Sequence, residues 1–99
     1  MFSKVLEFDP VDPIALFGMG NAQLVLEEYA DAADLLQRAI EVDKTNSPVY
    51  AARGKALEGM GAIEQAIDTY KQGVEVASRK GDLMPLKEME HRLLLLDTH

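Results

Sequence analysis

Two short stretches of this sequence contain residue types found in cofactor and metal sites. Gly18, Met19 and Gly20 begin like a dinucleotide-binding loop, but the third glycine is missing, no strand precedes them and the stretch lies inside a helical pattern. His91 follows Glu88 by three residues, which places both on one helical face, yet no third and fourth ligand converge on them. Neither stretch therefore predicts a cofactor or a metal.

Paired acids are the remaining candidates for chemistry. Glu27 adjoins Glu28, and Asp31 lies three residues before Asp34. General acid–base catalysis needs such groups buried and placed beside a nucleophile or substrate, and the sequence provides neither. We interpret these acids as a solvated convex face and predict that the chain is not an enzyme.

Composition and charge narrow the range of partners. The 99 residues contain no cysteine, which excludes disulfides and thiolate metal sites, and their 47% hydrophobic and 27% charged content is typical of one small globular domain. The net charge of −7 is uneven, because residues 1–50 hold nine acids and three bases. Nucleic acids and anionic membranes need Lys and Arg to displace counterions, so we expect neither as a partner.

No segment has the pattern of a membrane anchor or a secretion signal. The longest apolar run, residues 93–96, is far shorter than the roughly 18 residues that span a bilayer. The first residues lack the charged, apolar and small-residue order of a signal peptide. Together with the absence of cysteine, this favours a cytoplasmic protein.

Helical periodicity runs along most of the chain. Apolar residues recur at spacings of three and four in four segments, 13–26, 29–42, 47–60 and 63–80. Asp12 before Pro13, and Ser47 before Pro48, are typical of an N-cap followed by proline at the first helical position. Gly59 and Gly61 are expected to end the third segment and permit a tight turn.

The first four segments form two copies of one unit. The pattern of residues 16–22 returns 34 residues later at 50–56, and each copy is followed by an alanine-centred second helix. After residue 80 the period breaks. Gly81 and Asp82 indicate a helix stop followed by a new N-cap, and we expect a last helix over residues 83–96.

A 34-residue unit of two helices resembles the tetratricopeptide repeat (TPR), whose units bury their apolar faces by stacking on one another. The match rests on alternating bulky and small positions, expected to pack the repeats: Leu16, Gly20, Ala32, Leu36 and Ala39 in the first unit, and Tyr50, Gly54, Ala66, Tyr70 and Gly73 in the second. The resemblance implies an all-α fold, a right-handed solenoid of about five helices in a single domain of residues 1–99, with repeats at 13–46 and 47–80.

Both ends extend the resemblance. Residues 2–10 are similar to the end of a TPR second helix, and residues 39–44 correspond to residues 5–10 one period later. Either the chain was cut from a longer array, or residues 2–8 act as a cap. Residues 82–97 resemble the C-terminal cap of small bacterial TPR proteins, which favours a nearly complete chain.

The last helix is ambiguous. One stripe of it is expected to cover the end of the second repeat: Leu83, Leu86, Met89, Glu90, Leu93 and Leu96. Leu94 and Leu95 point partly elsewhere and are candidates for contact with a second copy. Simple capping and a homodimer both stay open.

Membership of this family implies a scaffold that binds proteins or peptides in a concave groove. Carried over position by position, the groove consists of mostly apolar residues with one amide and one cation: Phe17, Asn21, Leu24, Val25, Ala51, Lys55 and Glu58. An apolar side chain of the partner would bury itself on Phe17, with main-chain bonds to Asn21 and a carboxylate near Lys55. Alternatively, Asn21 is only a common family residue and Phe17 packs against the first cap.

Chaperone-tail clamping is not expected, because Phe17 and Ala52 stand where that subclass has a lysine and a second asparagine. Two functions remain. The first is a non-enzymatic scaffold for protein–protein interaction that binds through the groove. The alternative is a structural or self-assembling solenoid segment, as a homodimer or a piece of a longer array. The sequence does not identify the partner.

Overall fold

The computed structural model describes residues 12–97, which form five helices and no strand. The helices are α2 (Pro13–Val25), α3 (Tyr29–Val42), α4 (Ser47–Gly59), α5 (Ile63–Lys80) and α6 (Leu83–Asp97). The all-α prediction is confirmed, and every predicted helix in this range ends within one residue of the observed bound. The predicted partial repeat at residues 2–10 lies outside the described residues.

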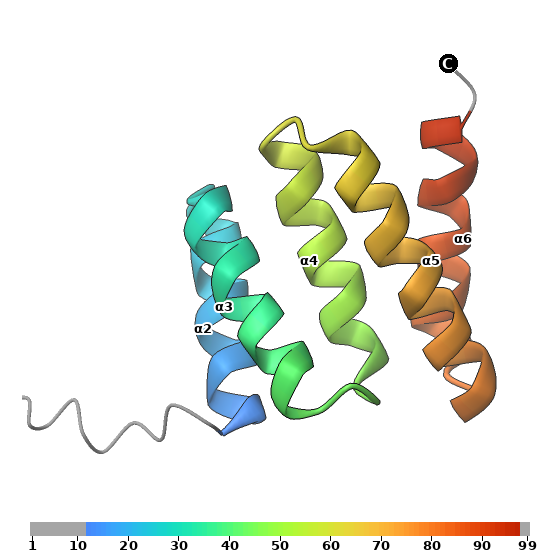
Figure 1. Ribbon diagram of the computed structural model, residues 1–99, viewed down its shortest axis with the longest axis horizontal. Helices are drawn as coiled ribbons and strands as arrows, with labels where there is room; N and C mark the ends of the chain where they lie inside the picture. Colours follow the sequence, from blue (N-terminus) through green and yellow to red (C-terminus); the bar gives the residue numbers. More distant parts are fainter. Residues whose placement is uncertain (1–11, 98–99) are drawn as a thin grey trace, which may run out of the picture.

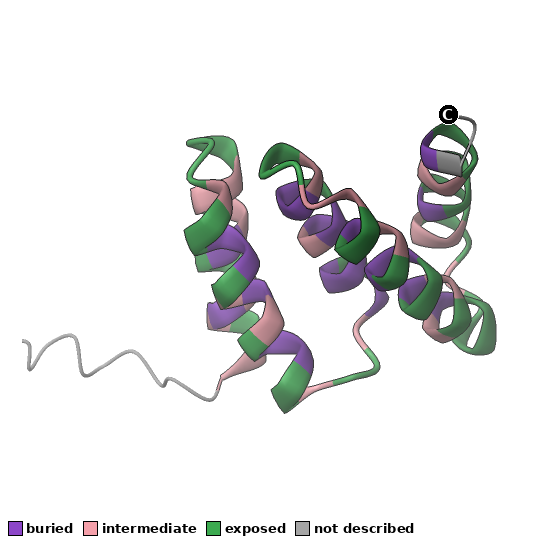
Figure 2. Ribbon diagram, turned by 45° about the horizontal axis from the view of Figure 1, so that its top comes forward, coloured by how far each residue is buried: buried purple, intermediate pink, exposed green. Residues whose placement is uncertain are grey.

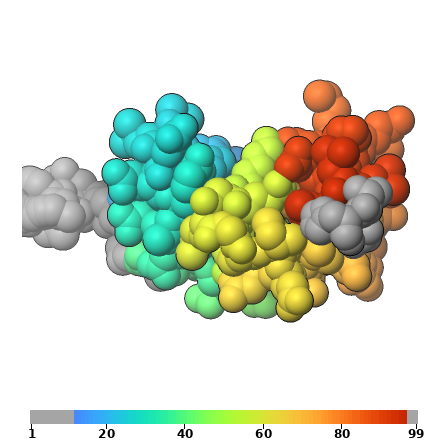
Figure 3. Space-filling view, turned by 90° about the horizontal axis from the view of Figure 1, so that it is seen from above, coloured from blue at the N-terminus to red at the C-terminus, as the bar shows by residue number. Residues whose placement is uncertain are grey.

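The helices form a solenoid of antiparallel pairs (Figure 1). Helices α2, α4 and α6 contact one another in a row, α3 packs on α2 and α4, and α5 packs on α4 and α6. Seen from above, the chain proceeds along the long axis from the first pair to the last helix (Figure 3). We call the row of α2, α4 and α6 the inner layer. Its neighbouring helices contact one another, whereas α3 and α5, the second helices of the two repeats, do not.

The two predicted N-caps differ in outcome. Asp12 caps α2 as expected, because its Oδ1 accepts a hydrogen bond from the Ile14 amide at 3.0 Å. Ser47 does not cap α4: it is the first helical residue and is fully buried, and Asn46 holds the cap position. Its hydroxyl instead donates to the Asp82 carboxylate at 2.6 Å, which joins the start of α4 to the start of α6.

The turns inside both repeats need a left-handed residue. Gly61 has φ +80°, and the residue one period earlier is Glu27, at φ +62°. Gly81 ends α5 at φ +74°, as predicted. Gly59 is the last residue of α4, as predicted, and the left-handed residue of the turn after it is Gly61. A Cβ at Gly59 would lie 2.5 Å from the Tyr29 ring, so this glycine admits the ring of α3.

The ten repeat-packing residues named from the sequence are all buried. Buried positions line the helix faces that meet one another, and exposed positions lie on the outside (Figure 2). Gly20 touches Leu36 so closely that an added Cβ would lie 2.6 Å from the leucine side chain. One period later, Gly54 is equally close to Tyr70, since an added Cβ there would lie 2.2 Å from the tyrosine ring. The two helices of a repeat therefore meet at a glycine.

Helix α6 covers the end of the second repeat with part of the predicted stripe. Met89 is fully buried against Gly73, Leu96 is buried, and Leu86 and Leu93 are half-buried. Leu83 and Glu90 were expected in this contact, but both are exposed. The covering stripe is therefore shorter than predicted.

Three helices are joined by one carboxylate. Glu58 of α4 accepts hydrogen bonds from the Tyr70 hydroxyl of α5 at 2.6 Å and from Arg92 of α6, whose Nε lies 3.1 Å away. Burial alone would raise the pKa of Glu58, but the bonds from Arg92 and Tyr70 outweigh it and hold that pKa below its usual value. Burial and the neighbouring Glu58 carboxylate raise the pKa of Tyr70, so its hydroxyl stays protonated.

Two glycines of α2 allow a matched test of the contact inside the first repeat. Gly20→Ala is expected to lower the free energy of unfolding by about 1–3 kcal/mol, because its Cβ collides with Leu36. Among residues 12–97, a Cβ at Gly18 would meet nothing within 4 Å, so Gly18→Ala should raise that free energy by about 1 kcal/mol through helix propensity. Urea unfolding followed by circular dichroism measures both; equal effects of the two variants would contradict the packing described.

The Glu58 cluster predicts a pH-dependent stability difference. The folded pKa of Glu58 is below its ordinary value of 4.5, so its contribution is present above that pH and is lost as pH falls through the folded pKa. At pH 7, Glu58→Gln should lower the free energy of unfolding by about 1–2 kcal/mol, since a charged acceptor is lost. Urea titrations between pH 7 and 3 should show this gap narrowing; a gap independent of pH would contradict the assignment.

Candidate functional site

The inner layer contains a hollow of about 470 Å³ bounded by three helices. Its lining comes from α2, α4 and α6: Phe17, Asn21, Leu24, Pro48, Ala51, Ala52, Lys55, Met84, Pro85 and Glu88. We call this hollow the groove. Five of the seven residues predicted for it lie there, namely Phe17, Asn21, Leu24, Ala51 and Lys55.

Local structure explains why these side chains converge. Phe17, Asn21 and Leu24 recur at spacings of four and three, so they share one face of α2. Ala51 and Lys55 are related in the same way on α4. Because α2 and α4 pack side by side, the two faces form adjoining walls. Phe17 and Leu24 are partly buried against the core, which fixes the apolar wall and leaves surface for a ligand.

Two predicted residues lie elsewhere. Val25 does not line the groove and is 80% exposed at the end of α2. Glu58 lines a second hollow of about 600 Å³, beside the groove, together with Tyr29, His91 and Arg92. There it is bonded to Arg92 and Tyr70, and its side chain is only 17% exposed. These contacts of Glu58 connect α4 to α5 and α6.

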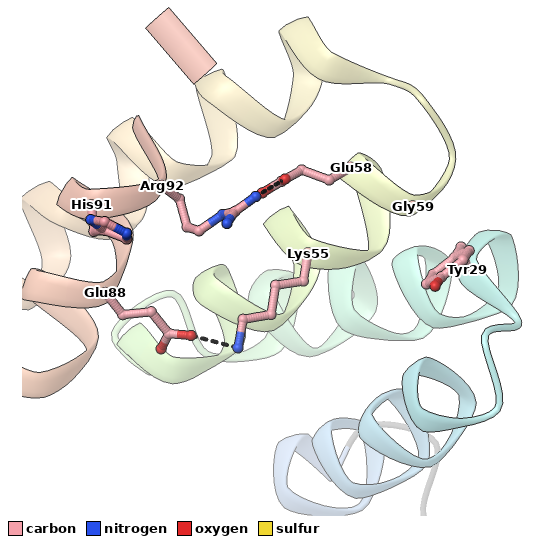
Figure 4. A pocket seen from close by; sticks show the side chains of 7 residues that line it. All are labelled: Tyr29, Lys55, Glu58, Gly59, Glu88, His91 and Arg92. Atoms are coloured by element: carbon pink, nitrogen blue, oxygen red, sulfur yellow. Dashed lines mark hydrogen bonds and ion pairs between the residues drawn. The ribbon is translucent and has the colours of Figure 1, made fainter. Parts of the chain in front are cut away.

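The groove and the second hollow meet at an ion pair. Lys55 of α4 and Glu88 of α6 line both hollows, and the lysine Nζ lies 2.5 Å from a Glu88 carboxylate oxygen. Figure 4 shows the two side chains facing each other, with Arg92 and Glu58 further along the same helices. Both partners of the Lys55–Glu88 pair are nearly half exposed, so the pair contributes about 0–1 kcal/mol to stability.

Helix α6 supplies groove residues that the sequence pattern did not predict. Met84, Pro85 and Glu88 form the third wall, and Met84 is 84% exposed. The predicted lining was carried over from the TPR family onto the two repeats, and α6 lies after the point where the 34-residue period breaks. One signal was available, since Met84 and Glu88 are four residues apart and so share a helical face that excludes the buried Met89.

Neither a metal-binding group of side chains nor a membrane-spanning helix occurs among the described residues. Within residues 12–97, no group of three or more His, Cys, Asp or Glu side chains is arranged to hold a metal ion. In the same range, no helix has the length and hydropathy needed to cross a membrane. Leu94 and Leu95 are 67% and 46% exposed, and Leu94 borders a hollow with Val74, Glu90 and Leu93.

Comparisons with known proteins give a consistent result, although no family model matches the sequence. A TPR repeat-containing protein of Pseudomonas aeruginosa is 35% identical over 81 residues, which cover 82% of this chain and 77% of the relative. A TPR domain protein of Salinibacter ruber has a crystal structure with a TM-score of 0.80 and 29% identity, covering 87% of this chain and 96% of that one.

A Bordetella parapertussis protein with a solution structure has a TM-score of 0.82 at 26% identity, covering 95% of this chain and 80% of that one. The two neighbours therefore share the fold over nearly all of this chain. The Pseudomonas relative matches in sequence over most of its own length as well. On the strength of that match and of its two glycine-centred helical repeats, the chain belongs to the TPR family.

Proposed function

We propose that this chain is a non-enzymatic interaction module that binds a segment of another protein in the groove. The observation that carries the proposal is the lining of the groove, where the apolar side chains of Phe17, Leu24 and Met84 lie beside one amide and one lysine–glutamate ion pair. Mostly apolar pockets with a few placed polar groups are typical of peptide and ligand sites. TPR family membership supports a scaffold role in general.

The lining defines the partner's chemistry. An apolar side chain of the partner fits between Phe17, Leu24 and Met84, and the Asn21 amide bonds to the partner's main chain. A carboxylate of the partner can bind Lys55, but it must replace Glu88, which holds that lysine now. Since the exposed pair is weak, this replacement costs little.

The groove predicts a loss of binding on truncation of its anchor residues. Phe17→Ala with Asn21→Ala is expected to weaken a captured partner's affinity by at least about tenfold, because an apolar anchor and a hydrogen bond are lost. The measurement is affinity capture from lysate of the source organism, quantified by mass spectrometry, followed by titration with the captured protein.

Asp34→Ala with Arg38→Ala provides the matched control, since both residues are exposed on α3 and outside the groove. It should retain the partners of the unmodified chain. Circular dichroism confirms that each variant is folded. If the groove variant keeps every partner with unchanged affinity, binding through the groove is excluded.

Self-association is the second candidate function, and the exposure of Leu94 beside Val74 and Leu93 favours it. In that case the chain is a structural segment, and Leu94 and Leu95 contact a second copy. Sedimentation at micromolar concentration should then show a species heavier than 10.9 kDa, which Leu94→Lys reverts to a monomer. A single 10.9 kDa species would exclude the dimer under those conditions.

A further inference from the structure

The second repeat contains a hollow with a surplus of cations. It has a volume of about 370 Å³ and lies between the loop after α3 and the helices α4 and α5. Its lining consists of Lys44, Thr45, Tyr50, Gln72, Glu75, Val76, Arg79 and Lys80. Three of these residues are cations and one is an acid, in a chain whose net charge is −7. We call this site the basic hollow.

The basic hollow lies on the side of α4 that is turned away from the groove. Tyr50 lines the basic hollow, whereas Ala51 and Lys55 line the groove. Because successive residues of an α-helix are about 100° apart, Tyr50 and Arg53 point away from these two groove residues. A ligand in the basic hollow would therefore not occupy the same space as a ligand in the groove.

Two of the three cations are bonded mainly to neutral groups. Lys44 Nζ donates to the Glu41 carbonyl at 3.4 Å, and Lys80 Nζ donates to the Thr45 carbonyl at 2.6 Å. Lys80 also lies 3.9 Å from the Asp82 carboxylate, a long distance for an ion pair. An ammonium group has three donors, so both lysines keep donors for a further acceptor.

The other carboxylates near the basic hollow are exposed or already bonded. Arg79 Nη2 lies 2.7 Å from Glu75, one turn back on α5, and both side chains are largely exposed. Such an exposed pair on one helix is weak, so a ligand can replace it. Asp43 acts on Lys80 at longer range, but its Oδ1 accepts two hydrogen bonds from Thr45.

A fourth cation lies one turn further along the same face of α4. Arg53 is half-buried between α3 and α5, where it donates to the Ala33 carbonyl at 3.4 Å and to the Thr69 hydroxyl at 2.9 Å. It forms no ion pair with any of residues 12–97. Burial lowers the pKa of Arg53, and the more distant Asp34 and Glu41 offset this only in part.

Helix dipoles explain only some of these cations. Arg79 and Lys80 are in the last turn of α5, where a positive charge is favourable, and Lys44 follows the end of α3 in the same way. Arg53 is in the middle of α4, where no helix end needs a cation. A half-buried charge that is held by neutral groups alone indicates that an anion is missing from its surroundings.

We propose that the basic hollow, together with Arg53, binds an acidic segment of another protein. One carboxylate of the segment binds among the three cations of the hollow, and a second binds Arg53. Tyr50 and Arg53 are about 4.5 Å apart along α4, and alternate side chains of an extended segment lie on one side about 7 Å apart. Two acids separated by one residue therefore reach both places, which a single small anion does not.

Titration of the full-length, ¹⁵N-labelled chain with synthetic peptides, followed by NMR, tests the proposal. The probe is the acetylated and amidated peptide Gly-Glu-Gly-Glu-Gly, and the control peptide has glutamine in place of both glutamates. The glutamate peptide is expected to cause saturable shifts at Arg53 Nε and at the amides of Thr45 and Lys80. The control peptide should cause none, because it carries no charge.

Two variants with the same loss of charge separate the site from the net charge. Lys44→Gln with Arg79→Gln should weaken the affinity for the glutamate peptide at least about fivefold. These two side chains contact only their own end of a helix, so the fold should be retained, which circular dichroism checks. Lys71→Gln with Lys87→Gln should leave the affinity unchanged, since both residues are exposed and outside the hollow.

The absence of saturable shifts, or equal binding of the two peptides, overturns the proposal. An equal loss of affinity in the two double variants would assign the binding to net charge and also overturn it. Shifts confined to Asn21 and Lys55 would place the peptide in the groove, again against the proposal. Inorganic phosphate is the last arm: if it binds as tightly as the glutamate peptide, the hollow is a small-anion site and does not bind a segment.

Discussion

The solenoid depends on the close approach of two helices at a glycine. In each repeat a large side chain of the second helix occupies the space where a glycine of the first has no Cβ, Leu36 at Gly20 and Tyr70 at Gly54. The small residues Ala32 of α3 and Ala66 of α5 are fully buried, as close packing of the two helices in each repeat requires. Each pair then presents its inner helix to the next, which aligns the walls of the groove.

The second repeat extends this contact through a polar group. Leu36 ends in methyl groups, whereas the ring of Tyr70 ends in a hydroxyl that donates to Glu58. Glu58 also binds Arg92, so the packing centre of the second repeat is connected to α6 by charged hydrogen bonds. The second repeat has Tyr70 where the first has Leu36, and the tyrosine hydroxyl shares Glu58 with Arg92 of α6. A buried tyrosine without such a partner would carry an unsatisfied hydroxyl.

The sequence predicted the features that depend on local periodicity and missed those that depend on distant contacts. Helix bounds came from spacing and the 34-residue period. The groove positions were implied by the TPR resemblance, and five of those seven residues line the hollow. The prediction for Ser47 failed because its hydroxyl partner, Asp82, lies 35 residues away. The α6 wall of the groove was missed because α5 has 18 residues where α3 has 14, which moves α6 out of the period. A repeat period cannot locate a helix that lies beyond the point where the period breaks.

The charge distribution would affect the rate at which a partner approaches differently from the affinity with which the groove binds it. The exposed acids of the first repeat, such as Asp31 and Asp34, lie on α3, outside the groove lining. Inside the groove, Lys55 and Glu88 cancel each other. Long-range charge therefore acts on the rate of encounter and on its salt dependence, favouring basic partners. In the proposed binding mode, affinity would rest on apolar contact and on whether Glu88 or a carboxylate of the partner binds Lys55. The exposed Lys55–Glu88 pair is weak, so this exchange would cost little free energy.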